Sequence, residues 1–357
     1  MLSYMSAKEA AEKWNISQRR VSVLCSEKRI EGAMMVGNMW IIPSNAEKPL
    51  DKRIIKAAEQ NVTLRPFVKW VGGKSQLIDE LNKLITCGTD NIPTKYCEPM
   101  VGGGALFFNV LSSFNFEQLY ISDINCELIN AYNVIKYDVE ELINKLDEMQ
   151  ILFSSMDDNG RKFYYYSVRD KFNSLTINEN TRIDKAVYFI FLNKTCFNGL
   201  YRVNKNGQFN VPMGSYKNPS ICDEENLRNV NKALQNVTIV CGDYTLSQSF
   251  IDKDTFVYID PPYRPISHTS GFTAYNTEAF DDNEQIRLAK FFDEISDVGA
   301  KAVLSNSDPK NVNPDDTFFD DLYSRYHIKR INATRAINSK AEKRGKISEL
   351  LITNIGE

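Results

Sequence analysis

The sequence predicts an α/β fold with a doubly wound, largely parallel sheet, an inserted, mainly helical subdomain and a small N-terminal unit. Short apolar segments alternate with helical patterns along residues 64–357, which is typical of a parallel sheet with crossover helices. Residues 138–235 interrupt this alternation for longer than one crossover requires. Residues 1–43 carry a separate pattern, and the polar stretch 44–63 is interpreted as a linker.

The N-terminal unit is predicted to contain two helices and a hairpin. Ser6 and Ser17 are typical N-cap residues, each followed by a helical run, and apolar runs flank the Gly-Asn pair at 37–38. This order resembles small excisionase-like and MerR-like winged helix-turn-helix domains. Arg19 and Arg20 fall on the outer face of the second helix, so contact with DNA is expected there. The alternative is a packing module that does not touch DNA.

Five segments of the main domain have the length and apolar character of buried strands. They are residues 95–99, 118–123, 237–243, 255–260 and 301–307. A helical pattern at 283–296 lies between the last two strands. The interruption at 138–235 is rich in aromatic and polar residues, and we expect it to be a mainly helical target-recognition insert.

The composition is that of a globular chain, with 43% hydrophobic and 25% charged residues. No apolar run approaches the length of a membrane span, and charges occupy the place of a signal-peptide core, so a cytoplasmic protein is expected. The seven cysteines form no C-x-x-C pair, and the simplest expectation is that all are reduced thiols. With only two histidines, a histidine-based metal site is not expected, and no metal is predicted.

The net charge of −3 argues against nucleic acid as a partner, but the basic residues are not evenly spread. Residues 194–217 carry four Lys or Arg side chains and no acid, and residues 325–346 carry eight against the single acid Glu342. Phosphate binding is local, so such segments are candidate DNA contacts. The alternative is a solvated charged face.

The segment 96–110 is a candidate ligand-binding turn. An apolar strand ends at Glu98-Pro99, three glycines follow, and a helical pattern begins. Glycines at such a turn let the backbone approach a nucleotide-like ligand, and Asp123 at the tip of the next strand suits a ribose diol. A tight packing turn is the alternative. No G-K-[ST] sequence follows, so an ATP site is not favoured.

The sequence Asp-Pro-Pro-Tyr at 260–263 ends the strand predicted before it. The prolines offer no N–H donors, but their carbonyls remain acceptors. Asp260 and a proline carbonyl therefore form a pocket of acceptors that suits an aromatic amine, with Tyr263 as a flat surface beside it. The alternative is a strand stopped by prolines, with Tyr263 filling the core. The motif alone does not choose between adenine and cytosine.

In this order, the motifs resemble those of the Dam family (D12 class, alpha group) of S-adenosylmethionine-dependent DNA adenine N6-methyltransferases. The matching segments are "FVKWVGGKSQL" (67–77), "EPMVGGGALFFN" (98–109), "SDIN" (122–125), "NKTCFNGLYRVNKNGQFNVPMG" (193–214), "DPPYRPISHTSGFTAY" (260–275) and "RGKISELLITN" (344–354). The resemblance covers roughly residues 64–355, and the shortest family members lack the N-terminal unit. Met100 and Met213 stand where phenylalanine is more usual, which removes no chemical group.

The resemblance implies a Rossmann-like methyltransferase sheet and a role for particular residues. The implied catalytic residues are Asp260, Pro261, Pro262 and Tyr263. The implied S-adenosyl-L-methionine contacts are Trp70, Lys74, Gly102, Gly104, Asp123, Asp243 and Asp260. The implied DNA contacts are Lys69, Asn198, Leu200 and Arg202, to which the N-terminal unit adds Arg19 and Arg20.

The function implied is transfer of a methyl group to the exocyclic amine of an adenine flipped out of double-stranded DNA, with GATC as the expected site. A cognate restriction endonuclease is a possible partner in this interpretation, and the sequence does not give the oligomeric state. Two alternatives stay open: methylation of cytosine N4 or of RNA by the same pocket, and a non-enzymatic regulator with a degenerate main domain.

Overall fold

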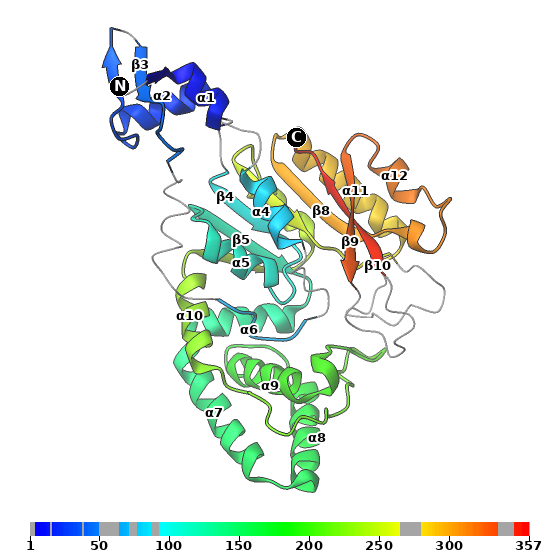
Figure 1. Cartoon of the computed structure of the whole chain (residues 1–357). Coiled ribbons are helices and arrows are strands. Elements are labelled where there is room, and N and C mark those ends of the chain that lie inside the picture. Colours follow the sequence, from blue (N-terminus) through cyan, green and yellow to red (C-terminus); the bar gives the residue numbers. More distant parts are fainter. Residues whose placement is uncertain are drawn as a thin grey trace.

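The computed structural model describes residues 4–14, 16–37, 39–49, 64–70, 77–86, 93–264, 280–334 and 346–356. In this part of the chain, seven strands form one central sheet in the order β6-β5-β4-β7-β8-β10-β9 (Figure 1). They are β4 (Lys95–Glu98), β5 (Gln118–Asp123), β6 (Val237–Cys241), β7 (Thr255–Ile259), β8 (Lys301–Ser307), β9 (His327–Thr334) and β10 (Lys346–Thr353).

The five predicted strands are confirmed as neighbours in the parallel part of the sheet. β10 joins β8 antiparallel, and β9 pairs with β10 at the edge. Neither of these two strands was predicted, because their residues were interpreted only as a basic segment and as a family motif. The sheet is therefore mixed, with a largely parallel centre.

The chain reverses its direction of winding between β4 and β7. From β4 it adds β5 and then β6 on one side, and afterwards it adds β7 and β8 on the other. In open α/β sheets, ligands bind beside the carboxyl ends of the strands at such a switch point. The segments that follow Glu98 and Ile259 meet there.

Each face of the sheet packs against its own layer of helices (Figure 1). Because side chains alternate along a strand, Tyr96 and Tyr258 join one core, whereas Cys97 and Val257 join the other. The first layer contains α4 (Ile78–Thr86), α5 (Ala105–Ser113) and α6 (Cys126–Tyr137), and the second contains η2 (Tyr244–Ser249), α11 (Asp282–Asp297) and α12 (Phe318–Leu322). The short η3 (Pro309–Asn311) follows β8.

Residues 138–235 are mainly helical, as expected, and several of their helices lie below the sheet in Figure 1. The elements are α7 (Val139–Ser155), α8 (Asp158–Ser174), α9 (Arg182–Thr195), η1 (Phe197–Gly199) and α10 (Glu224–Leu234). Lys185 on α9 is 4% exposed, and its Nζ lies 2.9 Å from Glu127 Oε1 on α6. This partly buried ion pair fixes the insert to the helix that follows β5.

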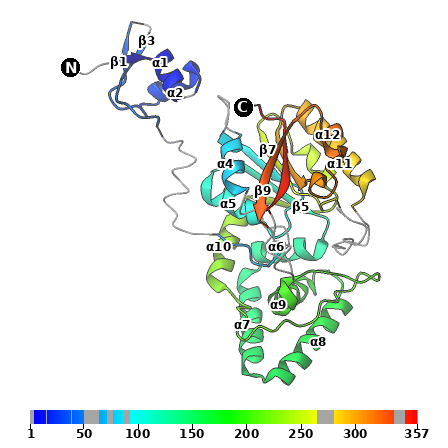
Figure 2. The ribbon, with the colours of Figure 1, turned by 45° about the vertical axis from the view of Figure 1, so that its right-hand side comes forward.

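The N-terminal unit contains α1 (Ala7–Trp14), α2 (Gln18–Ser26) and a three-stranded sheet of β1 (Tyr4–Ser6), β2 (Met34–Val36) and β3 (Met39–Pro43). Its buried residues pack among themselves, and Figure 2 shows the unit beside the main domain. The Ser17 side chain accepts a hydrogen bond from the Arg20 backbone N–H, as expected of an N-cap. The two helices and the hairpin follow the predicted order, and β1 was not predicted.

Among the described residues, no helix combines the length and the apolar character needed to cross a bilayer.

Candidate active site at the carboxyl edge of the sheet

Asp260 follows β7 directly and therefore lies at the switch point. Its Oδ1 accepts a hydrogen bond of 3.0 Å from Ser305 Oγ on the neighbouring strand β8. Ser305 Oγ is in turn 2.9 Å from the Tyr258 hydroxyl, which donates because the serine proton is used on Asp260. Burial raises the pKa of Tyr258 well above its usual value, so the phenol keeps its proton. The side chain of Asp260 is thus oriented by two buried hydroxyls.

Tyr263 is held at the other end of the Asp-Pro-Pro-Tyr segment. Its hydroxyl donates to Glu349 Oε2 on β10, 3.3 Å away. Burial, followed by the negative charge of Asp260, raises the pKa of Tyr263 well above its usual value. A neutral ring anchored by its hydroxyl can present one face to a flat ligand.

The glycine turn after β4 is held by Asp123, at the end of β5. Asp123 Oδ2 accepts a hydrogen bond of 3.0 Å from the Gly102 backbone N–H, and Oδ1 accepts one of 2.9 Å from Asn125. Burial raises the pKa of Asp123, and these two hydrogen bonds lower it in part. Asp123 therefore shapes the glycine turn.

Two glycines of this turn have positive φ and close side-chain neighbours. A Cβ at Gly102 (φ +50°) would lie 2.8 Å from Trp70 Cδ1, and a Cβ at Gly104 (φ +72°) would lie 2.5 Å from the Tyr132 hydroxyl. In this structure the absence of a side chain thus lets the turn approach two aromatic residues. The predicted approach of the same glycines to a ligand stays a prediction.

Glu98 ends β4 at the same edge and was not among the predicted site residues. It is 3% exposed, and its Oε2 accepts a hydrogen bond of 2.7 Å from the Tyr96 hydroxyl. Burial raises the pKa of Glu98 well above its usual value, and the negative charge of Asp260 adds to the shift. An acid at the last position of an apolar strand was the signal in the sequence.

Asp243 follows β6 and is engaged by its neighbours. Arg287 on α11 contacts both carboxylate oxygens, at 3.1 and 2.7 Å, and Thr245 donates from its N–H and its hydroxyl. Arg287 is the main cause that lowers the pKa of Asp243 to about 2. The expected contact of Asp243 with the cofactor stays a prediction, and Arg287 was not anticipated.

The predicted DNA-reading segment lies against the first predicted cofactor segment. Asn193, which is 2% exposed, accepts from the Lys69 N–H at 2.8 Å and donates to the Lys69 carbonyl at 2.9 Å. It also donates to the Gly199 carbonyl at 3.1 Å. One buried amide thus brings together Lys69 and the loop of Asn198, Leu200 and Arg202, which lie far from Lys69 in the sequence.

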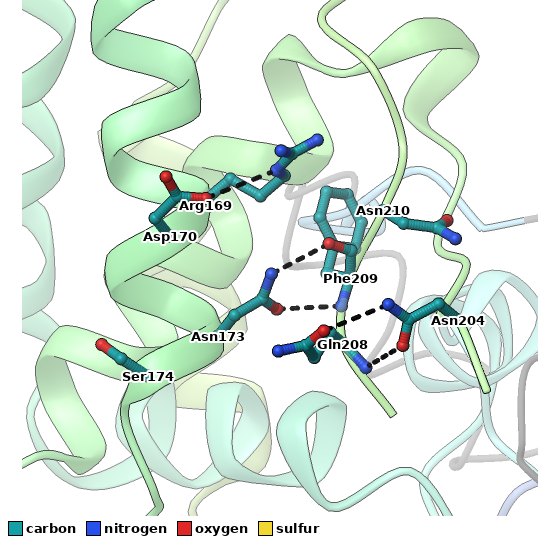
Figure 3. Close-up of a pocket in the computed structure, with 8 residues that line it drawn as sticks. All are labelled: Arg169, Asp170, Asn173, Ser174, Asn204, Gln208, Phe209 and Asn210. Carbon is teal, nitrogen blue, oxygen red and sulfur yellow. Dashed lines mark hydrogen bonds and ion pairs between the residues drawn. The ribbon is translucent and has the colours of Figure 1, made fainter. Parts of the chain in front are cut away.

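Arg202 begins a hairpin-like turn that packs on α8. Its Nε donates to Asn210 Oδ1 at 2.7 Å, which fixes the direction of the guanidinium. Asn173 on α8 makes two hydrogen bonds with the Phe209 backbone, accepting at 2.9 Å and donating at 3.0 Å (Figure 3). A polar groove of about 360 Å³ lies between helix and turn, and Asn204, Gln208 and Asn210 line its far side (Figure 3).

Three of the predicted contact residues remain to be located: one is not described, and two belong to the N-terminal unit. Lys74 lies outside the described residues. Arg19 and Arg20 belong to α2 of the N-terminal unit, where Arg19 is exposed and Arg20 is half-buried. Their contact with DNA stays a prediction.

The expectation that every cysteine is a reduced thiol is wrong for one pair. Cys126, at the start of α6, forms a disulfide with Cys241, at the end of β6, across a Cα–Cα distance of 5.3 Å. The register of β5 and β6 places Asp123 opposite Cys241, so the segments after both strands lie together. The two cysteines are 115 residues apart in the sequence, and no local spacing indicates such a pair.

The fold and the site define an α/β protein with acidic side chains at the switch point of its sheet and the predicted DNA-reading segment beside them. The model of the D12 class N6 adenine-specific DNA methyltransferase matches residues 70–337. The chain belongs to this family, and it is an adenine-specific DNA methyltransferase that acts on DNA with a methyl donor.

Individual relatives agree with this assignment. The chain is 47% identical over 300 residues to the type II methyltransferase M.MjaIII of Methanocaldococcus jannaschii, a match that covers 82% of this chain and 99% of the relative. It is 36% identical to the type II methyltransferase M1.LlaDCHI of Lactococcus lactis, covering 84% and 98% of the two chains. It is also 36% identical to a DNA adenine methylase of Haemophilus influenzae, covering 80% and 92%.

Proposed function

We propose that the chain transfers a methyl group from S-adenosyl-L-methionine to N6 of an adenine flipped out of duplex DNA, within the sequence GATC. The observation that carries this proposal is the oriented carboxylate of Asp260 beside two prolines at the switch point of the sheet. A carboxylate and a carbonyl there accept hydrogen bonds and donate none.

The residues at the sheet edge fit S-adenosyl-L-methionine. Asp123 ends β5 and Asp260 follows β7, on either side of β4 with its buried Glu98. The two carboxylates suit a ligand with a positive charge, hydroxyls and an amine. They do not suit a phosphate ester, whose charge the carboxylates would repel. When bound, the cofactor supplies a methyl group on a sulfonium. Asp123 would accept from the ribose hydroxyls, and Trp70 would lie against the bound molecule.

The enzyme's own groups would prepare the adenine amine. The lone pair of this amine is delocalised into the ring, so it is a poor nucleophile. Hydrogen bonds from its two N–H groups to Asp260 and to the Pro261 carbonyl would orient the nitrogen and favour the charge that develops on it. Proximity and orientation then supply most of the rate enhancement.

Tyr263 would hold the flipped base. A target inside a duplex cannot reach the pocket, so the base must leave the stack. The ring of Tyr263, fixed by Glu349, would stack on the base, and such contacts contribute about 1–3 kcal/mol.

The recognition segment supports a specific DNA site. Arg202 is a suitable bidentate donor to a guanine edge, and Asn210 holds its guanidinium in one direction. Asn193 joins Lys69 to Gly199, which lies between Asn198 and Leu200 in the same loop. The segments "NGLYR" and "FNVPMG" are close to those of family members that modify GATC.

The N-terminal unit would add a second DNA contact through Arg19 and Arg20, in the manner of a winged helix-turn-helix domain. Two of the relatives are named type II methyltransferases, which favours a restriction endonuclease as a functional partner.

Nucleoside analysis tests the proposal. Duplex DNA is incubated with the enzyme and methyl-labelled S-adenosyl-L-methionine, and the digested nucleosides are separated. We expect N6-methyladenine, and methylation-sensitive sequencing of modified plasmid should place it in GATC. Label in N4-methylcytosine, or label only with RNA, would favour the alternative substrates.

A further inference from the structure

The carboxyl end of β8 runs alongside the Asp-Pro-Pro-Tyr segment. β7 ends at Ile259, which pairs with Leu304, and β8 continues with three polar residues: Ser305, Asn306 and Ser307. Ser305 contacts Asp260, and Ser307 Oγ donates to the Arg264 carbonyl at 3.1 Å. The end of β8 therefore lies alongside the Asp-Pro-Pro-Tyr segment, from Asp260 to Arg264.

A buried glutamine contacts the middle of this segment. Gln285 on α11 is 0% exposed, and its Nε2 donates to the Pro262 carbonyl at 3.2 Å. Its Oε1 accepts from Asn306 Nδ2 at 3.0 Å, and Asn306 is also 0% exposed. The two amides form a short chain of hydrogen bonds that ends on the second proline.

Backbone N–H groups set the donor and acceptor order of these hydrogen bonds. Asn306 Oδ1 accepts from the N–H groups of Ser307 at 2.8 Å and Arg264 at 3.4 Å. These two donors fix which end of the Asn306 amide is oxygen, so its nitrogen must face Gln285. Gln285 then meets that nitrogen with its oxygen and directs its own nitrogen to Pro262.

The consequence concerns which proline carbonyl can bind the substrate. The Pro262 carbonyl already has its donor, whereas no hydrogen bond to the Pro261 carbonyl is found among the described residues. In an extended Pro-Pro segment, successive carbonyls point in different directions, so holding one also sets the other. Arg264 anchors the end of the segment through Asp282 and Asp316.

We infer that Gln285 and Asn306 are positioning residues for methyl transfer: they hold the Pro262 carbonyl away from the substrate and thereby direct the Pro261 carbonyl, together with Asp260, at the amine. This inference rests on the proposed function. If the two amides only satisfied each other in the core, their loss would lower stability without a specific effect on the chemical step.

The test is Gln285→Met, which keeps the length of the side chain and removes the donor to Pro262. We expect a single-turnover methylation rate about 10- to 100-fold below that of the wild-type enzyme, since small displacements of reacting groups have effects of this size. The dissociation constants for the cofactor and for duplex DNA should stay within about threefold of the wild-type values.

Gln150→Met is the matched control. Gln150 Oε1 accepts partly buried hydrogen bonds from the backbone N–H groups of Ile221 at 2.8 Å and Cys222 at 3.0 Å, but it lies on α7 in the insert. This variant should lose thermal stability while its methylation rate stays within about twofold of wild type. An equal loss of rate in both variants would overturn the inference.

Asn306→Leu removes the hydrogen bond between Asn306 and Gln285, which precedes the one to Pro262. It provides a second measurement if Gln285→Met does not fold. It should slow methylation by a similar factor, and the double variant should be no slower than the slower single variant. A folded Gln285→Met enzyme with a rate within twofold of wild type, or independent losses that multiply in the double variant, would contradict the inference. A wild-type enzyme that labels no adenine would instead contradict the proposed function.

Discussion

The indole of Trp70 stacks on the phenol ring of Tyr201, with ring centroids 5.6 Å apart and an interplanar angle of 22°. Trp70 lies against the glycine turn at Gly102, and Tyr201 directly precedes Arg202. The Tyr201 hydroxyl donates to Glu127 Oε2 at 2.6 Å. The proposed cofactor contact and the proposed DNA-reading segment therefore share one aromatic pair.

Tyr201→Leu should weaken cofactor binding. The substitution removes the stacked partner of Trp70, and such pairs contribute about 0.5–1.5 kcal/mol beyond their buried area. A dissociation constant for S-adenosyl-L-methionine that rises by about 2- to 10-fold is expected from calorimetric titration. Tyr201→Phe keeps the ring and loses only the Glu127 contact, so its affinity should lie closer to wild type. Equal affinities for all three proteins would show that the stack does not support the cofactor site.

Asn193→Ala should reduce both stability and sequence discrimination. The variant leaves the backbone groups of Lys69 and Gly199 without their buried partner, which costs about 1–3 kcal/mol for each group that water cannot reach. Urea unfolding measures the first effect. The second is the ratio of methylation rates on GATC and on duplexes with one changed base pair, which should fall. An unchanged ratio of methylation rates would show that Asn193 does not contribute to sequence discrimination.

Acid should weaken the contact between Asp243 and Arg287. Arg287 is the main cause of the lowered pKa of Asp243, about 2 against an ordinary value near 4, so the charged form is favoured in the folded state. The resulting stability is present above pH ~4 and is lost as the pH falls toward ~2. Both side chains are partly exposed, so the effect should be modest.

The comparison that isolates this effect is Asp243→Asn. Urea midpoints of wild type and variant, measured from pH 5 to pH 3, should converge as the pH falls. A constant difference across this range would contradict the assigned pKa shift.

The Cys126–Cys241 disulfide should be detectable by alkylation. Under denaturing conditions, two of the seven cysteines should react with a thiol reagent only after addition of a reductant, and peptide mapping should identify them as these two. Because the bond closes a long loop between the segments after β5 and β6, its removal by a double serine substitution should lower stability by about 2–4 kcal/mol. Seven reactive cysteines without reductant would contradict the bond.

Much of the fold could be predicted because the parallel strands are short, apolar and separated by helical patterns. β9 was missed because charged residues interrupt its apolar ones, as in "HIKRINAT", and β10 because "KISELLIT" was interpreted only as part of a family motif. The Asp260 end of the site could be predicted from the loss of donors at two prolines. Gln285 and Asn306 could not, because a lone amide on a helix or strand carries no pattern and acquires its role only when α11 and β8 pack against the proline segment.

The pairing of Cys126 with Cys241 could not be predicted for a similar reason, because it depends on how distant segments pack together. Their proximity depends on the register of β5 and β6, which is fixed by the packing of the whole sheet and not by local spacing. In contrast, the resemblance grouped Lys69 with the segment after α9 as DNA contacts, which stays a prediction. Asn193 supplies the physical cause of their proximity in the fold.

The most direct test of the central claim compares the wild-type enzyme with Asp260→Ala in a single-turnover assay on GATC duplex, followed by nucleoside analysis. The proposed function predicts N6-methyladenine with the wild-type enzyme and a rate at least about 100-fold lower with the variant, since loss of one preorganised group at a reacting centre has effects of this size. The variant should remain folded and still bind duplex DNA. A folded Asp260→Ala enzyme that methylates adenine at the wild-type rate would contradict the claim.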